Sequence, residues 1–374
     1  MNYSEERNAV WNRIKETDTF FIYGAQVIAY GVYIAIKEVL GKEPIAFLVS
    51  SIGDNPSIID RIPVIELNKN IRSSSFIIVA TPEIYHEEIK KNLEHHGYNN
   101  CLYVDTHMEY LIMSKYFRKT DRFKLLEEVP LLENMTNAYF SKKNNDLFGV
   151  TMYMAKSHKD FILKKNYKIP SWIQTIQVGS ALTDERICDL LDNTGDNIST
   201  KNRNYSELTA MYWVWKNRRD EYLGICHYRR ILLLKDNDIL KIKQNHINVV
   251  LPLPFVCYPD TSGQYGRYIS AEDQQKMFRA LKEVSPEYYE TAKQILKGSY
   301  LYNYNMFLAD YKTFDDYCRW IFPILKYLEK ICEPEGATRK DRYIGYIGEV
   351  LTAIYFLYNK NNLKIVHAEK KWMV

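Results

Sequence analysis

The stretch TFFIYGAQVIAYGVYIAIKEVL, residues 19–40, decides the class of the fold. Its first five residues, Thr19–Tyr23, are mostly apolar and predict a short strand. After Gly24, apolar residues lie nearly all round the segment Gln26–Leu40, as expected of a helix that packs on a sheet and is covered on its other sides. A strand followed at once by such a helix is the repeating unit of parallel α/β sheets.

The same alternation continues along the next sixty residues. Three more apolar strands are expected, at residues 45–49, 76–80 and 101–104. A helix is expected over Thr81–His96, with Pro82 in its first turn and Gly97 as its stop signal. Apolar strands separated by helices predict a parallel sheet covered on both faces. We therefore expect the α/β class, with a Rossmann-like domain over residues 1–110.

The loop after the first strand tests one specific cofactor. A dinucleotide-binding loop has the pattern G-x-G-x-x-G/A, but Gln26 occupies the second glycine position, where the pyrophosphate must approach the backbone. The second strand ends in Ser50-Ser51 instead of the acid that holds the ribose. NAD binding, and with it an oxidoreductase, is therefore disfavoured. A domain that binds another nucleotide or acts as a scaffold is favoured.

The composition excludes several other classes. The chain has 374 residues, enough for two or three domains. Its 50 Lys and Arg against 46 Asp and Glu give a net charge of +4, which is too balanced for a non-specific nucleic-acid binder. The 6 cysteines form no CxxC pair and indicate reduced thiols. The start, MNYSEERNAVWNRIKE, has no apolar signal-peptide core, and no long apolar run follows, so we expect a cytoplasmic protein.

A second α/β region begins after a polar stretch. Residues 111–146, which end in SKKNND, are expected to form a helical connector, and residues 147–374 a second domain with a helical C-terminal part. The strands expected there lie at residues 148–153, 173–178, 222–228 and 247–251, and the clearest helices at 317–330 and 346–358.

Three polar clusters mark this second domain. The run Asp192–Ser199 is either a set of turn-forming residues or a ligand loop at the edge of the sheet. In the next segment, Asn204 is expected to cap a helix and Glu207 to lie at its third position, a variant of the capping box, so Glu207 is either a cap or a functional acid. The third cluster, His227–Arg230, closes a strand. Two guanidiniums are costly to bury without an anion, so the cluster indicates a phosphate site, with a structural ion pair as the alternative.

Together these clusters resemble a known family. The strings DNTGDNIS (192–199), KNRNYSELTAMYWVWKN (201–217) and YLGICHYRR (222–230) are similar to the capsular-polysaccharide glycosyltransferase family described as domain of unknown function 4422. The resemblance covers about residues 147–374. It implies a GT-A-like fold and transfer of a hexose, such as galactose, from a nucleotide-diphosphate sugar to a growing capsular or surface polysaccharide. The alternative is a non-catalytic nucleotide-sugar-binding or regulatory partner of polysaccharide synthesis.

The resemblance also implies a donor site. Its residues would be His158, Lys159, Gly179, Asp192, Asn197, Asn202, Glu207, His227, Tyr228, Arg229 and Arg230. Our hypothesis is that Arg229 and Arg230 stabilise the leaving diphosphate directly, so that no cofactor is required. The alternative is that Asp236-Asn237-Asp238, an Asp-x-Asp sequence, holds Mn²⁺ or Mg²⁺.

An inverting transferase also needs a carboxylate that deprotonates the acceptor hydroxyl. Glu349 is the first candidate, because it lies seven residues after Arg342 and one helix can present both. Asp196 is the second candidate, with a role at the donor ribose equally open. Asn305 and Arg342 are expected at the acceptor. The partners implied are a nucleotide-sugar, with UDP favoured, and a glycan or lipid-linked acceptor, which allows peripheral association with the inner face of the membrane.

Overall fold

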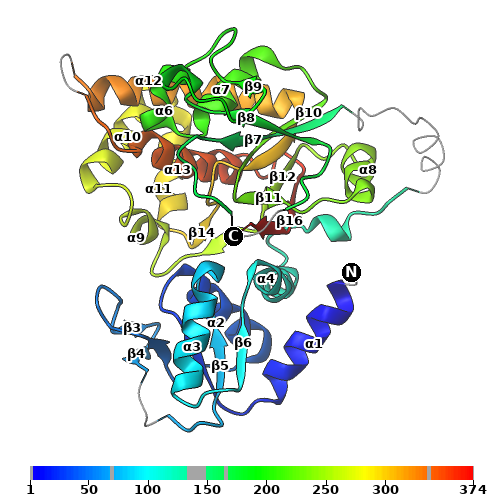
Figure 1. Cartoon of the computed structure of the whole chain (residues 1–374), viewed down its shortest axis with the longest axis vertical. Helices are drawn as coiled ribbons and strands as arrows, with labels where there is room; N and C mark the ends of the chain where they lie inside the picture. Colours follow the sequence, from blue (N-terminus) through cyan, green and yellow to red (C-terminus); the bar gives the residue numbers. More distant parts are fainter. Residues whose placement is uncertain (1–2, 68–70, 133–148, 164–166, 335–337, 374) are drawn as a thin grey trace. The chain divides into compact units, whose positions relative to one another are not determined.

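A computed structural model describes residues 3–67, 71–132, 149–163, 167–334 and 338–373 (Figure 1). The chain forms two compact units. The first comprises Met1–Lys124 with Phe255–Pro259 and Val374, and the second Leu125–Pro254 with Asp260–Met373. The compact boundary thus falls after Lys124, and part of the expected 111–146 connector belongs to the first unit. The rest of that connector, from residue 133, lies outside the described residues.

The first unit contains a six-stranded sheet in the order β3-β4-β2-β1-β5-β6. Its strands are β1 (Phe20–Tyr23), β2 (Phe47–Val49), β3 (Ile58–Ile59), β4 (Ile62–Glu66), β5 (Phe76–Val79) and β6 (Cys101–Tyr103). All neighbouring pairs are parallel except β3 with β4. Counted along the chain, the five parallel strands have the order 3-2-1-4-5, which is typical of doubly wound folds. The α/β class and its parallel sheet are confirmed.

Helices separate these strands. They are α1 (Tyr3–Glu16), α2 (Val27–Leu40), η1 (Glu83–Tyr85), α3 (His86–His95) and α4 (Thr106–Thr120). Between β1 and α2, Gly24 has φ +120°, and a Cβ there would lie 2.6 Å from the Ala80 carbonyl oxygen. Only glycine fits this passage beside the end of β5. Gln26, at the second glycine position of a dinucleotide loop, donates to Asn55 Oδ1 at 2.7 Å.

The second unit is built on a mixed sheet in the order β16-β12-β15-β10-β7-β8-β9, and β11 joins β10 and β17. The strands are β7 (Val150–Lys156), β8 (Ile173–Gln177), β9 (Leu190–Leu191), β10 (Tyr222–His227), β11 (Arg230–Leu232), β12 (Val249–Pro252), β15 (Phe307–Asp310), β16 (Ile365–Ala368) and β17 (Lys370–Trp372). A shorter strand of this unit is β14 (Tyr300–Leu301), whereas β13 (Phe255–Val256) belongs to the first unit. β7 pairs in parallel with both β8 and β10, so the carboxyl ends of these three strands meet at one edge.

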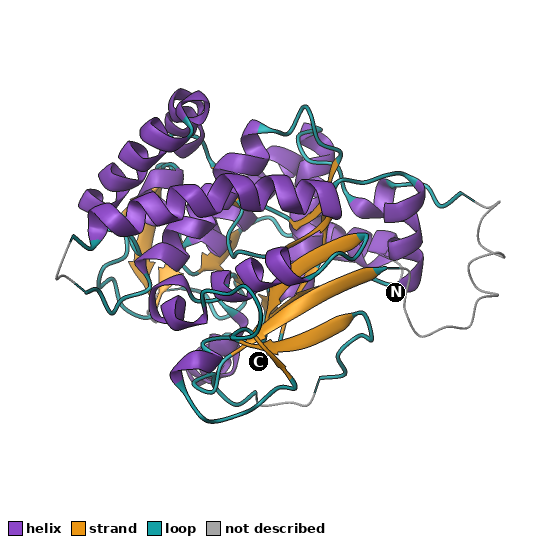
Figure 2. Cartoon of the chain, turned by 90° about the horizontal axis from the view of Figure 1, so that it is seen from above, coloured by secondary structure: helices purple, strands orange, loops and turns teal. Residues whose placement is uncertain are grey.

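The helices of the second unit lie over the strands of its sheet (Figure 2). They are η2 (Leu126–Glu128), η4 (Ser180–Leu182), η5 (Ser199–Lys201), α6 (Asn202–Tyr205), α7 (Leu208–Asn217), α8 (Asp236–Gln244), α9 (Thr261–Tyr265), α10 (Ala271–Val284), α11 (Pro286–Leu296), α12 (Tyr311–Cys332) and α13 (Tyr343–Tyr358). Both α7 and α12 contact β10. None of the helices within the described residues combines the length and apolarity needed to span a bilayer.

The expected capping box before α7 is wrong. Asn204 lies inside α6, and its side-chain amide donates to the carbonyls of Arg339 and Asp341 at 2.9 and 3.0 Å. Glu207 occupies the N-cap position of α7 but makes no side-chain capping bond. Ser206, with φ +52°, ends α6 and changes the direction of the backbone before α7. The Glu207 carboxylate accepts a hydrogen bond from the buried Asn305 amide instead.

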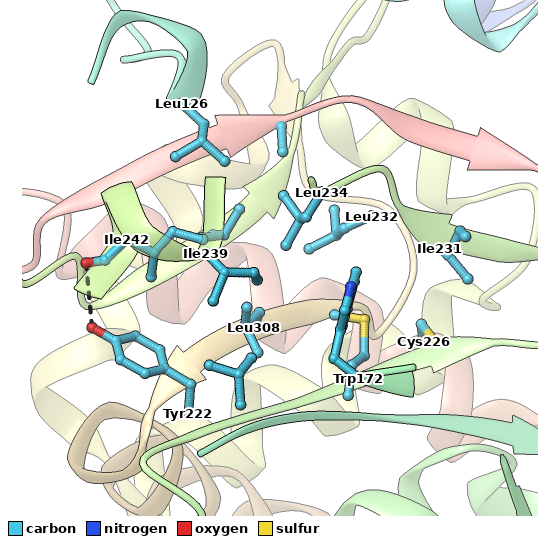
Figure 3. Packing of buried hydrophobic residues seen from close by; sticks show 14 of the residues in the cluster. Leu126, Trp172, Tyr222, Cys226, Ile231, Leu232, Leu234, Ile239, Ile242 and Leu308 are labelled. Atoms are coloured by element: carbon cyan, nitrogen blue, oxygen red, sulfur yellow. Dashed lines mark hydrogen bonds between the residues drawn. The ribbon is translucent and has the colours of Figure 1, made fainter. Parts of the chain in front are cut away.

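An apolar core holds the site-bearing strands in place (Figure 3). It joins β10 and β15 to α8 through fully or almost fully buried side chains such as Cys226, Leu308 and Ile242. The Tyr222 hydroxyl is buried with them and donates to the carbonyls of Ile247 at 3.0 Å and Ile242 at 3.5 Å. All six cysteines of the chain are free thiols, as their scattered positions predict.

Candidate active site

A cavity of about 550 Å³ opens at the edge where β7, β8 and β10 end. Its lining comes from the loops that follow these strands, from α6 and from the segment before α13. The lining residues are Ala155, Ser157, His158, Lys159, Asp160, Phe161, Val178, Gly179, Leu182, Asn202, Arg203, Ser206, Glu207, His227, Tyr228, Arg229, Lys340 and Arg342. The carboxyl edge of parallel strands is where α/β proteins bind their ligands.

The cavity brings together nine of the residues singled out in the sequence. They are His158, Lys159, Gly179, Asn202, Glu207, His227, Tyr228, Arg229 and Arg342. Eight others do not line it: Asp192, Asp196, Asn197, Arg230, Asn305, Glu349, Asp236 and Asp238. The structure therefore separates the predicted set into residues that can touch a ligand and residues that support or lie apart from the cavity.

Asp192 supports the cavity wall from inside. It is fully buried and accepts hydrogen bonds from the backbone N–H groups of Gly179 at 2.9 Å and Ser180 at 3.0 Å. The hydroxyls of Ser180, Ser199 and Thr209 also donate to it. A carboxylate with five donors is fully satisfied. Asp192 therefore fixes the loop after β8. Because it is buried, it cannot contact a bound nucleotide-sugar.

Gly179 gives that loop its shape. Its φ is +63°, and a Cβ there would lie 2.7 Å from Asn202 Oδ1. The Asn202 amide in turn donates to the Ser206 carbonyl at 2.8 Å and to Thr209 Oγ1 at 3.1 Å. These contacts join the loop after β8 to the start of α7, so Gly179 and Asn202 form one wall of the cavity as a packed pair.

The Asp196 turn does not reach the cavity. Asp196 is exposed and accepts a hydrogen bond from the Tyr212 hydroxyl at 3.1 Å. Asn197 completes the turn through its own side chain, which donates to the Gly195 carbonyl at 2.9 Å. The structure thus places both residues in a surface turn, as turn-forming residue types require. This placement removes the geometric basis for Asp196 as a base and for Asn197 as a donor ligand.

Glu207 is the most enclosed acid of the cavity lining, with 4% of its side chain exposed. Its Oε1 accepts from Asn305 Nδ2 at 2.6 Å, and its Oε2 lies 3.4 Å from the Arg342 guanidinium. Burial alone would raise the pKa of Glu207, but nearby His227, Arg342 and the Asn305 amide outweigh burial and hold it below its usual range. Glu207 is therefore ionised at neutral pH.

His227 closes β10 beside this acid. Its Nε2 lies 3.7 Å from Glu207 Oε1, beyond hydrogen-bonding distance, and has no hydrogen-bond partner among the described residues. Burial lowers the pKa of His227 to about 4. The charges of Arg230, Arg342 and Arg229 contribute to this shift, and the charge of Glu207 opposes it. The imidazole is therefore neutral at pH 7, so one of its nitrogens can donate a hydrogen bond to a ligand and the other can accept one.

Asn305 and Arg342 position Glu207 from opposite sides. Asn305 is completely buried, donates also to the Gly345 carbonyl at 3.2 Å and accepts from the Thr352 hydroxyl at 3.2 Å. Arg342 lines the cavity, is 49% exposed and donates through Nε to Ser206 Oγ at 2.7 Å. Of the two residues expected at the acceptor, only Arg342 can therefore touch a ligand.

Glu349 lies in α13 and is not among the residues that line the cavity. It accepts a hydrogen bond from the backbone N–H of Tyr304. Burial, followed by the charge of Glu207, raises the pKa of Glu349 to about 7, although Arg230 and Arg342 oppose the shift. Glu207 and Glu349 are thus a pair of acids whose surroundings push their pKa values apart, which is characteristic of active sites. The first candidate for the base nevertheless does not line the cavity.

The two neighbouring arginines at the end of β10 have different surroundings. Neither Arg229 Nε nor Arg230 Nε has a hydrogen-bond partner among the described residues. Arg229 lines the cavity, and its guanidinium lies 5.2 Å from the centroid of the Tyr228 ring. The Arg230 guanidinium instead lies between two rings, 4.1 Å from the centroid of Tyr304 and 4.8 Å from that of Trp372. Such cation–π packing stabilises the fold and occupies the cation. Of the predicted pair, only Arg229 lines the cavity.

The Asp-x-Asp sequence does not fit a metal site. Asp236 and Asp238 form the first turn of α8, where Asp238 Oδ2 accepts from the Lys235 backbone N–H at 3.0 Å. Its Oδ1 lies 3.8 Å from Lys241 Nζ, and neither acid lines the cavity. Among the described residues, no group of three or more His, Cys, Asp or Glu side chains is arranged to hold a metal ion.

Sequence analysis missed several lining residues, of which Asp160 matters most. It lies two positions after His158 and one after Lys159, both of which were predicted, so its place after the strand was the signal that could have found it. Arg203 and Lys340 add two cations. The lining thus holds five cationic side chains, from Lys159, Arg203, Arg229, Lys340 and Arg342, against the acids Asp160 and Glu207. A cleft with this balance attracts an anionic ligand.

Comparisons with known proteins agree with this fold. The solved structure described as "WbbM bifunctional glycosyltransferase apo structure" has a TM-score of 0.52 and 28% sequence identity, over 60% of this chain and 45% of that one. The chain therefore spans less than half of that protein, with which it shares an α/β glycosyltransferase fold. No curated protein sequence matches the chain.

Residues 151–361, more than half of the chain, match the sequence model of the family described as domain of unknown function DUF4422. The chain belongs to this family.

Proposed function

We propose that this protein is a glycosyltransferase that moves a hexose, such as galactose, from a nucleotide-diphosphate sugar to a growing capsular or surface polysaccharide. Support comes from the fold shared with the bifunctional glycosyltransferase and from the cavity at the carboxyl edge of β7, β8 and β10. The observation that carries the proposal is the cavity's mixture of charges. Five cations suit a diphosphate, and enclosed carboxylates suit the hydroxyl groups of a sugar.

In this scheme Arg229 and Lys159 hold the diphosphate, and Arg229 stabilises the charge that develops on it as it leaves. Preorganised donors aimed at developing charge are worth about 3–4 kcal/mol each in transition-state stabilisation. No cofactor is then required. Glu207 receives sugar hydroxyl groups, since its ionised carboxylate is held rigidly by Asn305 and Arg342. The neutral His227 offers an uncharged partner beside it.

We propose a UDP-sugar as the donor and a glycan or lipid-linked glycan as the acceptor. The GT-A-like arrangement, the cytoplasmic location and peripheral association with the inner face of the membrane belong to the same proposal. The first unit would serve as a scaffold or bind another nucleotide, because its loop after β1 lacks the second glycine of a dinucleotide site.

A thermal-shift panel of UDP-, GDP-, dTDP- and CMP-sugars and NAD(P), first in EDTA and then with manganese, tests the donor. We expect one nucleotide-sugar to raise the Tm in EDTA, and Arg229→Gln to abolish the rise. Arg279→Gln is the matched control, because Arg279 is an exposed arginine of α10 outside the cavity lining. Stabilisation by NAD(P) alone would refute the proposal.

The same panel separates the enzyme from the non-catalytic alternative. A regulatory partner would bind the nucleotide-sugar without consuming it. We expect slow release of the free nucleoside diphosphate when the preferred donor is incubated with the protein alone, since water can replace the acceptor. Release should be faster with glycan acceptors present. Tight donor binding without release under either condition would favour the regulatory partner.

A further inference from the structure

The loop after β7 carries an acid for which no role has yet been given. Residues 157–160 form a closed turn in which the Asp160 N–H donates to the Ser157 carbonyl at 3.0 Å. The Ser157 N–H donates to Asp160 Oδ2 at 2.7 Å. This bond fixes the carboxylate at the cavity wall by one oxygen. No described residue donates a hydrogen bond to the other oxygen, Oδ1.

Tyr228 holds the same loop against the end of β10. Its hydroxyl accepts the backbone N–H of Phe161 at 3.3 Å. Asp160 is therefore fixed beside the turn that carries Arg229. Arg229 is the cation that we propose to bind the diphosphate. Lys156, at the end of β7, and Arg342 complete the cationic surroundings of Asp160.

The two acids of the lining differ in how their oxygens are used. Glu207 has Oε1 engaged by Asn305 and Oε2 close to Arg342. Asp160 has one engaged oxygen and one without a donor among the described residues. A general base must have a free lone pair within reach of the proton that it removes. Asp160 Oδ1 meets this condition with no competing donor among the described residues, whereas each oxygen of Glu207 already has a donor beside it and keeps only its remaining lone pairs for sugar hydroxyl groups.

We propose that Asp160 is the catalytic base of the transfer reaction, an inference that rests on the proposed function. The acceptor hydroxyl oxygen forms a bond to the anomeric carbon of the donor sugar. The bond from that carbon to the diphosphate oxygen breaks, and its electron pair leaves with the nucleoside diphosphate. The hydroxyl proton passes to Asp160 Oδ1. This single displacement inverts the configuration at the anomeric carbon.

The electrostatic surroundings agree with this role. Burial raises the pKa of Asp160 to about 6, although the Ser157 N–H and the cations Arg229, Lys156 and Arg342 oppose the shift. A carboxylate with such a pKa is mostly ionised at pH 7 and is a stronger base than an ordinary aspartate. Glu349, whose pKa is also raised, is not among the residues that line the cavity.

The test compares Asp160→Asn and Asp160→Ala with Asp184→Asn, an exposed acid outside the lining. The substrate is the nucleotide-sugar that stabilises the protein in the panel, with water or sodium azide as acceptor. Azide attacks without losing a proton and therefore does not need a base. We expect Asp160→Asn to lower kcat for donor hydrolysis by about 10²–10⁴-fold, with its Tm and donor KM close to those of the parent.

We further expect Asp160→Ala to form a glycosyl azide of inverted configuration faster than it hydrolyses the donor. In the pH profile of kcat/KM for hydrolysis, the fall below about pH 6 should be absent from this variant. Retained hydrolysis in Asp160→Asn, or equal losses with water and azide, would overturn the assignment of the base alone. If the parent protein consumes none of the nucleotide-sugars with any acceptor, the proposed function fails, and the assignment of Asp160 fails with it.

Discussion

Each sheet of this protein contains neighbouring parallel strands, but the residues that follow those strands are very different. In the first unit, the two residues after β1, β2 and β5 are all uncharged: Gly24-Ala25, Ser50-Ser51 and Ala80-Thr81. In the second unit, β7 is followed by Ser157–Asp160 and β10 by Tyr228-Arg229. Both edges are places where α/β folds bind ligands, but only one carries side chains for chemistry. The difference shows that function follows the residues at the edge and not the sheet.

The largest expected effect comes from comparing one glutamate in each unit, Glu207 before α7 and Glu66 at the end of β4. Glu207→Gln should reduce sugar transfer by about 10²–10³-fold, because it removes the ionised acid that receives sugar hydroxyl groups. Glu66→Gln, at the end of β4 in the first unit, should leave turnover within about twofold, although Glu66 accepts a hydrogen bond from the Ile52 N–H. Steady-state kinetics with the preferred donor measures both. Equal losses in the two variants would show that the first unit also contributes to catalysis.

A pair of loop glycines sharpens the comparison. Gly24→Ala and Gly179→Ala each force a Cβ into a backbone with positive φ, within 2.6 and 2.7 Å of another atom. We expect each to lower the free energy of unfolding by about 1–3 kcal/mol, measured by urea denaturation. Only Gly179→Ala should also raise the KM for the donor. A raised KM in Gly24→Ala as well would remove the distinction between the two loops.

The smallest expected effect is on the free energy of unfolding and concerns two acids, Glu349 in the second unit and Asp60 in the first. Glu349 has a raised pKa, so its protonated form favours the folded state. Its contribution is fully present below the unfolded value of about 4.5 and is lost as the pH rises through about 7. Glu349→Gln should therefore raise the free energy of unfolding at pH 8, on the order of 1–2 kcal/mol, and should flatten its fall between pH 5 and 7 in denaturation curves.

Asp60 of the first unit is the opposite case and serves as the control. The Tyr33 hydroxyl and Lys37 lower its pKa, so its contribution is present above its unfolded value of 3.8 and is lost as the pH falls through its lower folded value. Asp60→Asn should cost about 0.5–1 kcal/mol at neutral pH, since the pair is partly exposed. If Glu349→Gln also destabilised the protein at pH 8, Glu349 would be ionised in a favourable pair, contrary to the raised pKa.

The sequence predicted four strands of each sheet, because an apolar run is a local signal. The strands β9, β11, β15, β16 and β17 of the second sheet were not predicted. Apolar runs such as 76–80 become strands wherever they fall, and the polar residues that follow a strand must lie at its end. His158, Lys159, His227 and Arg229 reach the cavity for this reason. The hairpin of β3 and β4 and the helix α1 were not predicted, since their residues are mixed in polarity and depend on packing within the first unit.

The supporting residues could not be predicted from local patterns. Asp192 is enclosed by donors from residues 179, 180, 199 and 209, which only the folded chain brings together. The split between Arg229 and Arg230 could not be predicted either, because the sequence does not show that Tyr228 and Arg229 form the turn after β10 and that Arg230 begins the next strand, β11. Spacing along α13 likewise placed Glu349 on the same helix that follows Arg342 without showing that Glu349 does not line the cavity.

The buried amide of Asn305 makes the cavity sensitive to one chemical change, deamidation. Its nitrogen faces Glu207 Oε1 at 2.6 Å, and its oxygen accepts from Thr352, so its two ends are not interchangeable. Deamidation would replace the donor by a second acid facing Glu207, and the two like charges would repel. A lesion that removes only one nitrogen atom would thus disable the cavity while the rest of the fold stayed intact. The chemical lifetime of the site therefore depends on how well the core keeps water from one side chain.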